Sequence, residues 1–600
     1  MPKSPVSLQI GNTTFRRPWR IPEGLRVLEK FNSEYNFKRD RESEKYESQL
    51  IRAISETGVL ESDGKNKEWK GGHGRKFLSF CQKFGFISPR PNNIWGKGLY
   101  DLNKNGEDKF LIDFLNNSTT DIKIEKFPFS ITPLGKMLAD TNSNEYEITS
   151  EQKDIFLKSL YYQIQPSIVN PFGKMYDGET IRPLQLFIKI LLGLIEENME
   201  PTLSTGEISL IVNTAWTNNL SIIIDELKLF REKKKGKERK FAKFWFESKG
   251  GKNLYKIDFD TIWTYADPNI SYLCSTGLID KLGRKIILNK DKIETSKIIS
   301  KEGEFKFANN EDYLNEFWSG NLLPFEDEKF LTEKAISNTN ILKEKFNYES
   351  LVTQDKEFEK NKIKKIIYHS EDKIQEFEEI EFFKKQRHST EEILDTLKKI
   401  DSDYITYNGI EFEPEPEHLE WIVWRAFLAI NSFINEIKDT RGFKVDSNFL
   451  PTHHAPGGKE DLYFEFDKYS LIIEVTFKTG GSQFKDEVEP VYRHTAKRMN
   501  LLGDKPVYCL FIAPTIDLNL SNSFQRKYYD SKNEEYSGNI VPISIEQFSK
   551  MFLKLFHEKK ILTPILFKEI FDIILEKKIE KEPKEWQTFI NTTIEHKLSV

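Results

Sequence analysis

The 600-residue chain has few cysteines and no long hydrophobic run, and each absence excludes a class of protein. Its three cysteines, Cys81, Cys274 and Cys509, are far apart and odd in number, so they form neither a disulfide framework nor a zinc-ligand spacing. The most apolar segment, residues 186–195, contains Lys189 and is too short to cross a bilayer. The first residues, MPKSPVSLQIGN, have no apolar signal core. We therefore expect a cytoplasmic protein in a reducing compartment, without membrane contact.

The net charge of −5 hides an uneven distribution of charge along the chain. Residues 65–97 contain eight Lys or Arg against one Glu, residues 231–256 contain eleven against three acids, and residues 401–418 contain six acids and no Lys or Arg. Aromatic residues interleave both basic runs, at Trp69, Phe77, Phe80 and Trp95 and at Phe241, Phe244, Trp245 and Phe246. Local positive surface is what phosphate binding requires, so the pattern favours nucleic acid over solvated loops, the alternative.

A chain of this length exceeds a single hydrophobic core, and four segments are distinguishable. In the first half, helices precede short hairpins. A helix predicted over 76–84 stops at Gly85, and another starts at Thr132 and Pro133. A third helix ends at Gly277 and is followed by predicted strands at 278–279 and 286–288. The last pattern is typical of a winged helix, with an ordinary α+β unit as the alternative. We predict winged-helix-like subdomains over 1–160 and 161–300, a Lys/Glu-rich helical linker over 301–404, and a final domain over 405–600.

The final segment alternates helices and strands in the manner of an α/β nuclease core. After a hinge at 405–416, the sequence predicts a helix over 418–437, a hairpin, a buried strand over 507–513, and helices over 545–558 and 564–577. The overall fold class is therefore multidomain α+β.

Two carboxylates within this hairpin are the most informative residues. Asp461 opens the run DLYFEF and Glu474 closes LIIEV, with the short connector 467–470 between them, so they lie on neighbouring strands. A carboxylate in an apolar strand is costly unless it meets a proton, a cation or hydrogen-bond donors. Carboxylates held together normally bind a hard divalent metal such as Mg²⁺, which activates water in phosphodiester hydrolysis. A solvent-facing pair is the alternative.

Further side chains near this hairpin are candidates for the same site. Glu487 is either a third metal ligand or the start of a surface helix, and Glu420 in the run EWIVWRAF needs a buried partner, either the metal cluster or an ion pair with Arg425 or Lys485. The role of general base stays open between Lys478, Gln483 and Lys485. His453 and His454 precede Pro456 in a turn, where histidine is more often structural.

The runs EWIVWRAF, PTHHAPGGKEDLYFEF, LIIEVTFKTGGSQFKDEVEPVYRH and YCLFIAP resemble the cleavage domain of the AlwI family of type IIS restriction endonucleases, which includes large subunits that act alone as nicking endonucleases. ITPLGKMLAD and STGLIDKLGRKIILNKDK resemble its N-terminal half more loosely. The resemblance implies a PD-(D/E)xK-type cleavage domain whose catalytic set falls on Glu420, Asp461, Glu474 and Glu487, with Thr476 in place of the usual lysine. Lys485 or a second metal would help to deprotonate the attacking water. Asp461, Glu474 and Glu487 would be the metal ligands, with Mg²⁺ replaceable by Mn²⁺.

The resemblance also implies the partners. Such a prokaryotic enzyme binds a short asymmetric site in double-stranded DNA and cuts outside it at a fixed distance. It is accompanied by a cognate DNA methyltransferase, and it needs a second catalytic domain, from another copy or a small subunit, to cut both strands. The alternatives are a strand-specific nicking enzyme and a DNA-binding protein that does not cleave. The DNA-binding candidates are Arg16, Arg17, Arg20, Lys70, Arg75, Lys76, Lys233, Lys234 and Lys235.

Overall fold

In the computed structural model the chain divides into two compact units, residues 1–281 with 285–374, and residues 282–284 with 375–600. The structure describes residues 8, 10–11, 15–34, 43–57, 71–88, 130–142, 148–165, 167, 180–214, 219–255, 257–305, 307, 310–348, 360–402, 404–407, 410–430, 432–446, 448–455, 458–529, 535–557 and 564–599.

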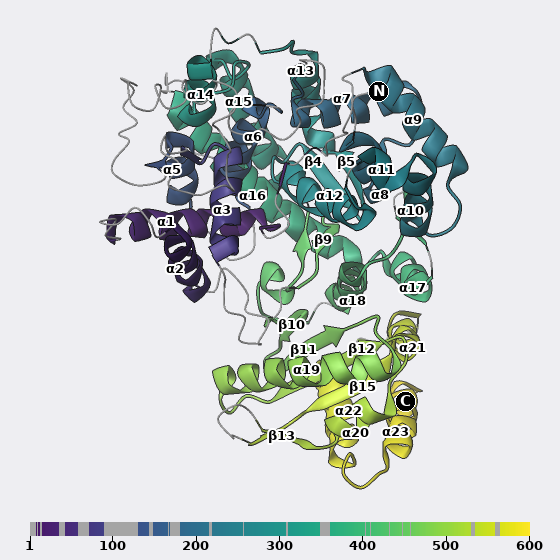
Figure 1. The fold of residues 1–600 in the computed structure, drawn as a ribbon. Coiled ribbons are helices and arrows are strands. Elements are labelled where there is room, and N and C mark those ends of the chain that lie inside the picture. Colours follow the sequence, from purple (N-terminus) through teal and green to yellow (C-terminus); the bar gives the residue numbers. More distant parts are fainter. Residues whose placement is uncertain are drawn as a thin grey trace. The chain divides into compact units, whose positions relative to one another are not determined.

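The first unit is mainly helical (Figure 1). Its helices are α1 (Ile21–Glu34), α2 (Ser43–Glu56), α3 (Gly71–Lys83), α5 (Pro133–Asp140), α6 (Ser150–Tyr162), α7 (Pro183–Glu196), α8 (Thr205–Glu207), α9 (Leu220–Lys233), α10 (Glu238–Ser248), α11 (Gly251–Tyr255), α12 (Phe259–Cys274), α13 (Ile293–Lys301), α14 (Asn310–Ser319) and α15 (Glu328–Phe346). The 3₁₀ turns η1 (Pro18–Arg20) and η4 (Lys290–Lys292) and the π-helical segment η3 (Ile208–Val212) also belong to it. Helix α16 (Lys360–Gln386) begins in this unit and ends in the other.

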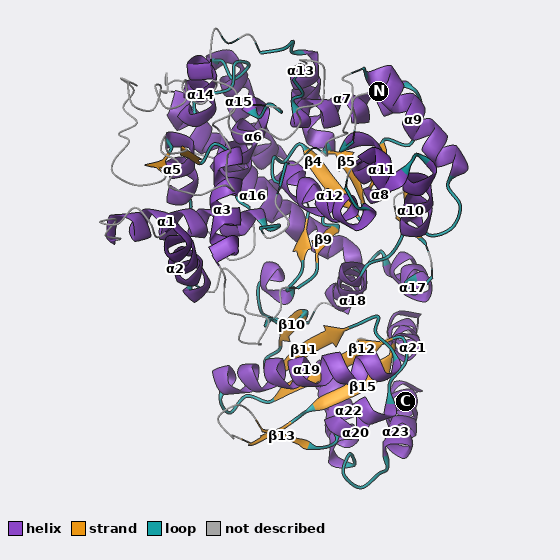
Figure 2. Ribbon diagram, in the orientation of Figure 1, coloured by secondary structure: helices purple, strands orange, loops and turns teal. Residues whose placement is uncertain are grey.

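Two small antiparallel sheets complete the first unit (Figure 2). Strand β1 (Ile87–Ser88) pairs with β2 (Ser130–Ile131), while β3 (Thr202–Ser204), β4 (Ile279–Leu282) and β5 (Lys285–Leu288) form a sheet in the order β3-β5-β4. The local predictions here are confirmed: Gly85 ends α3 with a φ of +71°, which a glycine adopts without strain, and Thr132 caps α5 by accepting a hydrogen bond from Gly135 N–H.

The second unit is built on a mixed four-stranded sheet. Strands β10 (Leu462–Glu465), β11 (Ser470–Val475), β12 (Val507–Ala513) and β15 (Ile540–Ser544) lie in this order, with β10 antiparallel to β11 and the others parallel. Every residue of β12 is buried, as expected for a central parallel strand. The remaining strands are β6 (Ile405–Tyr407), β7 (Ile410–Phe412), β8 (Lys444–Val445), β9 (Pro451–His453), β13 (Lys527–Tyr529) and β14 (Glu535–Ser537).

Helices cover both faces of this sheet. They are α17 (Thr390–Lys399), α18 (Pro416–Ile430), α19 (Gly480–Leu502), α20 (Leu518–Phe524), α21 (Ile545–His557), α22 (Pro564–Glu576) and α23 (Pro583–Ser599), with the 3₁₀ turn η5 (Ile437–Thr440). On one face Phe427 of α18 stacks on Phe464 of β10 and on Phe548 and Phe567 of α21 and α22. On the other face α19 and α20 pack on β12 and β15.

Three sequence expectations for this unit need correction. The helix predicted over 418–437 ends at Ile430, and the segment expected to be a hinge contains the β6-β7 hairpin. The unit begins at residue 375 rather than 405, because the end of α16 and all of α17 pack on α18: Phe382 stacks on Trp424, and α17 contributes the buried residues Ile393 and Leu397. Among the helices that the structure describes, none is both long and apolar enough to span a membrane.

Candidate active site

The candidate site lies where β10 begins and β11 ends. Their antiparallel register pairs Leu462 with Ile473, which confirms the predicted hairpin, and one further step along it places Asp461 across from Glu474. Facing residues on paired strands project from the same side of the sheet, with Cβ atoms about 5 Å apart. Register alone therefore brings the two carboxylates together.

These two carboxylates are held by hydrogen bonds. Asp461 Oδ2 accepts a hydrogen bond of 2.8 Å from the backbone N–H of Val475, the residue after Glu474. Glu474 is only 7% exposed, and its Oε1 lies 2.7 Å from Nδ1 of His494 on α19. These hydrogen bonds fix both side chains on the sheet face that α19 covers.

Helix α19 contributes Glu487 and His494 from one face, because residues seven apart are two helical turns apart. Glu487 Oε1 accepts a 3.1 Å hydrogen bond from the hydroxyl of Thr476 and lies 3.0 Å from Nζ of Lys478. Thr476 and Lys478 follow directly after β11. The end of β11 and the start of α19 are therefore joined through Glu487.

Glu420 reaches the site from α18. It is 4% exposed, and its Oε2 accepts a 3.0 Å hydrogen bond from Ala455 N–H. The alternative of an ion pair with Arg425 or Lys485 is wrong: Arg425 forms a two-pronged pair with Glu392, at 2.8 and 3.0 Å, and Lys485 is exposed.

The buried carboxylates raise one another's pKa. Burial is the largest cause in each case and raises the pKa of Glu420, Asp461 and Glu474 well above their usual values. The second cause is a neighbouring negative charge: Asp461 raises the pKa of Glu420, Glu474 raises that of Asp461, and Glu460 raises that of Glu474. Such a group of acids retains its protons or needs a cation, and raised carboxyl pKa values of this kind are typical of functional sites.

His494 is buried with an imidazole that favours the neutral form. Burial, followed by the charge of Arg493, lowers its pKa. When Glu474 is ionised, Nδ1–H donates to the carboxylate, so the opposite nitrogen carries a lone pair. Nε2 is buried and has no hydrogen-bond partner among the described residues. The ring therefore acts on the site through Glu474.

The donor set fits a magnesium ion held by two protein carboxylates. Mg²⁺ takes oxygen ligands, retains several waters and is commonly held by one or two carboxylates, and Asp461 and Glu474 offer such a facing pair. Within the described ranges, no three His, Cys, Asp or Glu side chains converge closely enough to hold a metal by themselves. Glu487, expected as the third ligand, has its Oε1 bound to Thr476 and Lys478.

The three candidates for a general base differ in their surroundings. Gln483 is fully buried and links two loops: its amide donates to the carbonyls of Lys478 and Thr515 at 3.0 and 2.8 Å, and its carbonyl accepts from Asp517 N–H at 2.8 Å. Its role is therefore structural. Partial burial lowers the pKa of Lys478, but its hydrogen bonds and charge attraction to Glu487 and Asp486 together outweigh this and leave the pKa raised, so Lys478 is charged at neutral pH. Lys485 is exposed.

The two turn histidines contact their immediate neighbours. His453 Nδ1 is 3.2 Å from the hydroxyl of Thr452, and His454 Nδ1 is 2.7 Å from the carbonyl of Ala455. Since Ala455 N–H binds Glu420, this turn supports the site from one side.

A family model described as AlwI restriction endonuclease matches residues 119–551, well over half of the chain, and this range includes all four candidate acids. The chain belongs to the AlwI restriction endonuclease family. It is therefore a restriction nuclease that binds DNA, as the sequence motifs indicated.

A solved structure, the small subunit (R.BspD6I2) of the heterodimeric restriction endonuclease R.BspD6I, is similar to this AlwI-family chain at 25% identity. The match covers 34% of this chain and 98% of that one, with a TM-score of 0.28. None of the curated proteins matches the chain.

The predicted DNA-binding residues of this AlwI-family protein lie in its first unit. Arg16 pairs with Asp267 at 3.2 Å, and Arg17 and Arg20 are half-buried beside it in sequence. Arg75 and Lys76 are exposed on α3, and Lys70 lies outside the described residues.

The second predicted basic group surrounds the start of α10. Lys233 and Lys235 are exposed, whereas Lys234 pairs with Glu238 at 3.8 Å. Three of the four aromatic residues in α10 are buried in the core, and Phe244 is exposed. The interleaving of aromatic and basic residues is therefore mostly the pattern of an amphipathic helix.

Sequence reasoning missed His494, Glu460 and Arg498. Glu460 is buried and forms an ion pair with Arg498, whose guanidinium lies 3.8 Å from the centre of the Tyr463 ring. The spacing of Glu487, His494 and Arg498 along one helix face was an available signal, since positions 7 and 11 apart return to the same side.

Proposed function

We propose that this AlwI-family chain is a type IIS enzyme that binds a short asymmetric DNA site and hydrolyses phosphodiester bonds at a fixed distance outside it, with Mg²⁺ as cofactor. The observation that carries the proposal is the facing pair of Asp461 and Glu474 on β10 and β11, each held by a hydrogen bond and each with its pKa raised by burial. Burying two carboxylates side by side costs free energy, and a bound cation that neutralises them would offset that cost.

The strand order supports a PD-(D/E)xK-type assignment for the second unit. A helix, α18, precedes the hairpin β10-β11, and α19 connects β11 to the parallel strand β12. In the first unit, a three-stranded sheet in the order β3-β5-β4 with α12 immediately before the β4-β5 hairpin supports a winged-helix recognition module.

Each side chain of the site has a distinct task in this proposal. Asp461 and Glu474 hold Mg²⁺, which when bound polarises the scissile phosphate and lowers the pKa of a bound water. His494 keeps Glu474 oriented through the 2.7 Å hydrogen bond. Lys478, charged and anchored on Glu487, orients the anionic phosphate rather than accepting a proton.

A strand-specific nicking enzyme is the second candidate function. The described residues contain one site of this kind, and one site cuts one strand, so double-strand cleavage needs a second copy or a small catalytic subunit. Mn²⁺ would substitute for Mg²⁺, and the host would need a methyltransferase that protects the same site.

The test is digestion of supercoiled plasmid with Mg²⁺, followed by run-off sequencing of the ends. We expect cleavage at a constant offset from one short asymmetric sequence, and we expect Glu474→Ala to bind the same sequence without cutting it. Linear product indicates double-strand cleavage and open-circular product indicates nicking. Specific binding without scission by the wild type, with either Mg²⁺ or Mn²⁺, would refute the nuclease proposal.

A further inference from the structure

The corner between α9 and α10 carries a cluster of lysines that the first unit does not neutralise. Seven of the sixteen residues from 228 to 243 are Lys, with Arg231 and Arg239 among the rest and only two acids. Five of these lysines are exposed and have no ion-pair or hydrogen-bond partner among the described residues: Lys228, Lys233, Lys235, Lys240 and Lys243. The two acids are Glu232 and Glu238, and Glu238 is buried. The solvent-facing surface of the corner is therefore strongly positive.

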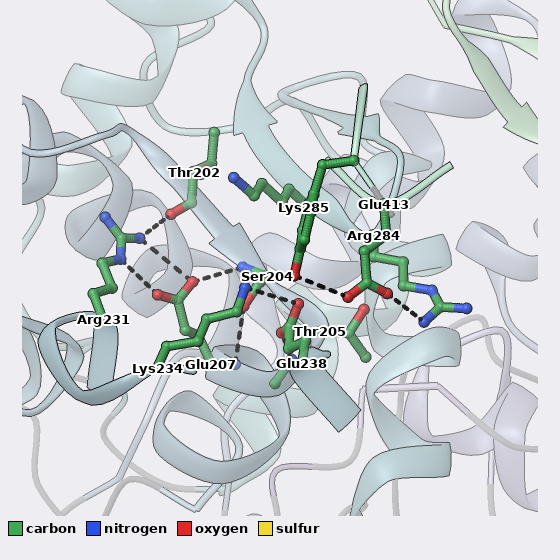
Figure 3. A network of polar contacts seen from close by, with 12 residues as sticks. Thr202, Ser204, Thr205, Glu207, Arg231, Lys234, Glu238, Arg284, Lys285 and Glu413 are labelled. Carbon is green, nitrogen blue, oxygen red and sulfur yellow. Dashed lines mark hydrogen bonds and ion pairs between the residues drawn. The ribbon is translucent and has the colours of Figure 1, made fainter. Parts of the chain in front are cut away.

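The lysine-bearing loop is anchored at both ends on the same short segment, residues 200–207 (Figure 3). At the first end, Arg231 binds Glu207 at 2.5 Å and donates to the carbonyls of Glu200 and Thr202 at 2.9 and 2.5 Å. Glu207 is itself tied to Ser204 by a reciprocal capping box. An arginine with this many acceptors has its charge satisfied internally and is not available for an external anion.

The second end is anchored by a buried acid. Glu238, at the start of α10, accepts a 2.6 Å hydrogen bond from Gly206 N–H and pairs with Lys234 at 3.8 Å. A Cβ on Gly206 would lie 2.5 Å from Glu238 Oε1, so a larger residue at this position would displace the Glu238 carboxylate. Between the anchors, Gly236 turns the chain with a φ of +70°. The loop is therefore preorganised, and binding to it costs little ordering entropy.

Phe244 adds an apolar group to the same surface. It is 67% exposed, whereas its neighbours Trp245 and Phe246 are buried in the core. On α10 it follows Lys240 by one helical turn and adjoins Lys243. An exposed ring among cations suits a partner that offers both anionic and apolar surface.

From this arrangement we infer that the α9-α10 corner is a DNA backbone clamp, in which Lys228, Lys233, Lys235, Lys240 and Lys243 contact phosphates of the duplex and Phe244 contacts deoxyribose or base edges between them. The inference rests on the proposed function, and DNA is the occupant because the family is one of DNA-cleaving enzymes and the charge is complementary. The clamp positions the duplex and does not read its sequence. Lys234, predicted from sequence to bind DNA, instead holds Glu238.

The test is the salt dependence of binding to a fluorescein-labelled duplex of arbitrary sequence, in EDTA, by fluorescence anisotropy. Each phosphate contact contributes about 0.9 to the slope of log affinity against log salt. We therefore expect Lys240→Gln with Lys243→Gln to reduce the slope by about 2 and to weaken binding equally on different sequences. Phe244→Ser should weaken binding with the slope unchanged, because it removes no charge.

The matched control is Lys343→Gln with Lys360→Gln, which removes the same charge from exposed positions on α15 and α16. Two results would overturn the clamp. One is that the Lys343/Lys360 control lowers the salt slope as much as the Lys240/Lys243 double variant does. The other is that the Lys240/Lys243 double variant has the same slope as the wild type. The same experiments separate failure of the clamp from failure of the nuclease proposal. If the slope of the Lys240/Lys243 double variant falls as expected but the wild type does not cut plasmid, the clamp stands and the nuclease proposal fails. If the wild type cuts plasmid but the slope of the double variant is unchanged, the clamp fails.

Discussion

Removal of the His494 side chain tests whether the site depends on a prepositioned Glu474. His494 is 5% exposed and Glu474 is 7% exposed, and 2.7 Å separates Nδ1 from Oε1. In His494→Ala the carboxylate oxygen loses its donor at a place that water reaches poorly. Without this donor, the ionised form of Glu474 becomes harder to maintain.

The expected magnitude follows from the type of hydrogen bond. A bond to a charged group contributes about 1.5–3 kcal/mol, so the free energy of unfolding should fall by about that amount from this bond alone. Loss of a residue that orients a metal ligand typically reduces activity or metal affinity by about 10–100-fold. We therefore expect slower cleavage and a higher Mg²⁺ concentration for half-maximal rate.

The assay is a Mg²⁺ titration of plasmid cleavage, with urea denaturation measured in parallel. His494→Asn is the matched control, because the Asn amide places a donor near the position of Nδ1 in a smaller side chain. We expect His494→Asn to recover most of the Mg²⁺ response, although it leaves a small cavity. Equal defects in both variants would show that volume matters and the hydrogen bond does not, and a wild-type Mg²⁺ response in His494→Ala would refute the positioning role.

Two further predictions concern the charge and the loops of the site. Without metal, the pKa of Glu474 in the folded protein is raised above the usual 4.5, so Glu474 contributes its full share of stability below pH 4.5 and loses it as pH rises through the raised pKa. The Tm of Glu474→Gln should therefore increase relative to that of the wild type as pH rises. Mg²⁺ should raise the Tm of the wild type only. A constant Tm difference across pH in EDTA would contradict this. Gln483→Leu removes three partly buried hydrogen bonds of about 1 kcal/mol each, so urea denaturation should show a loss of about 3 kcal/mol in the free energy of unfolding. Cleavage should also slow, because the segment that carries Lys478 loses its anchor. A loss within the range of Ser482→Ala, an exposed neighbour, would exclude the linking role.

Local sequence encodes much of this fold because many elements depend on neighbours in the chain. A proline after Thr132 starts α5, Gly85 ends α3, and the apolar run 507–513 becomes a buried central strand. The pairing of Asp461 with Glu474 was predictable in the same way, since a hairpin with a short connector leaves few registers that bury its apolar side chains.

Other features arise only when distant segments meet. His494 lies twenty residues from Glu474, and Ala455 lies thirty-five residues from Glu420, yet each pair forms a hydrogen bond that sets the site's geometry. Arg425 likewise takes Glu392 rather than a neighbour on its own helix as its partner. Hydrogen-bond partners of buried polar groups depend on which atoms packing brings within about 3 Å. Sequence periodicity predicts which face of a helix or strand is buried, but it does not predict which hydrogen-bond partner a buried polar group finds there.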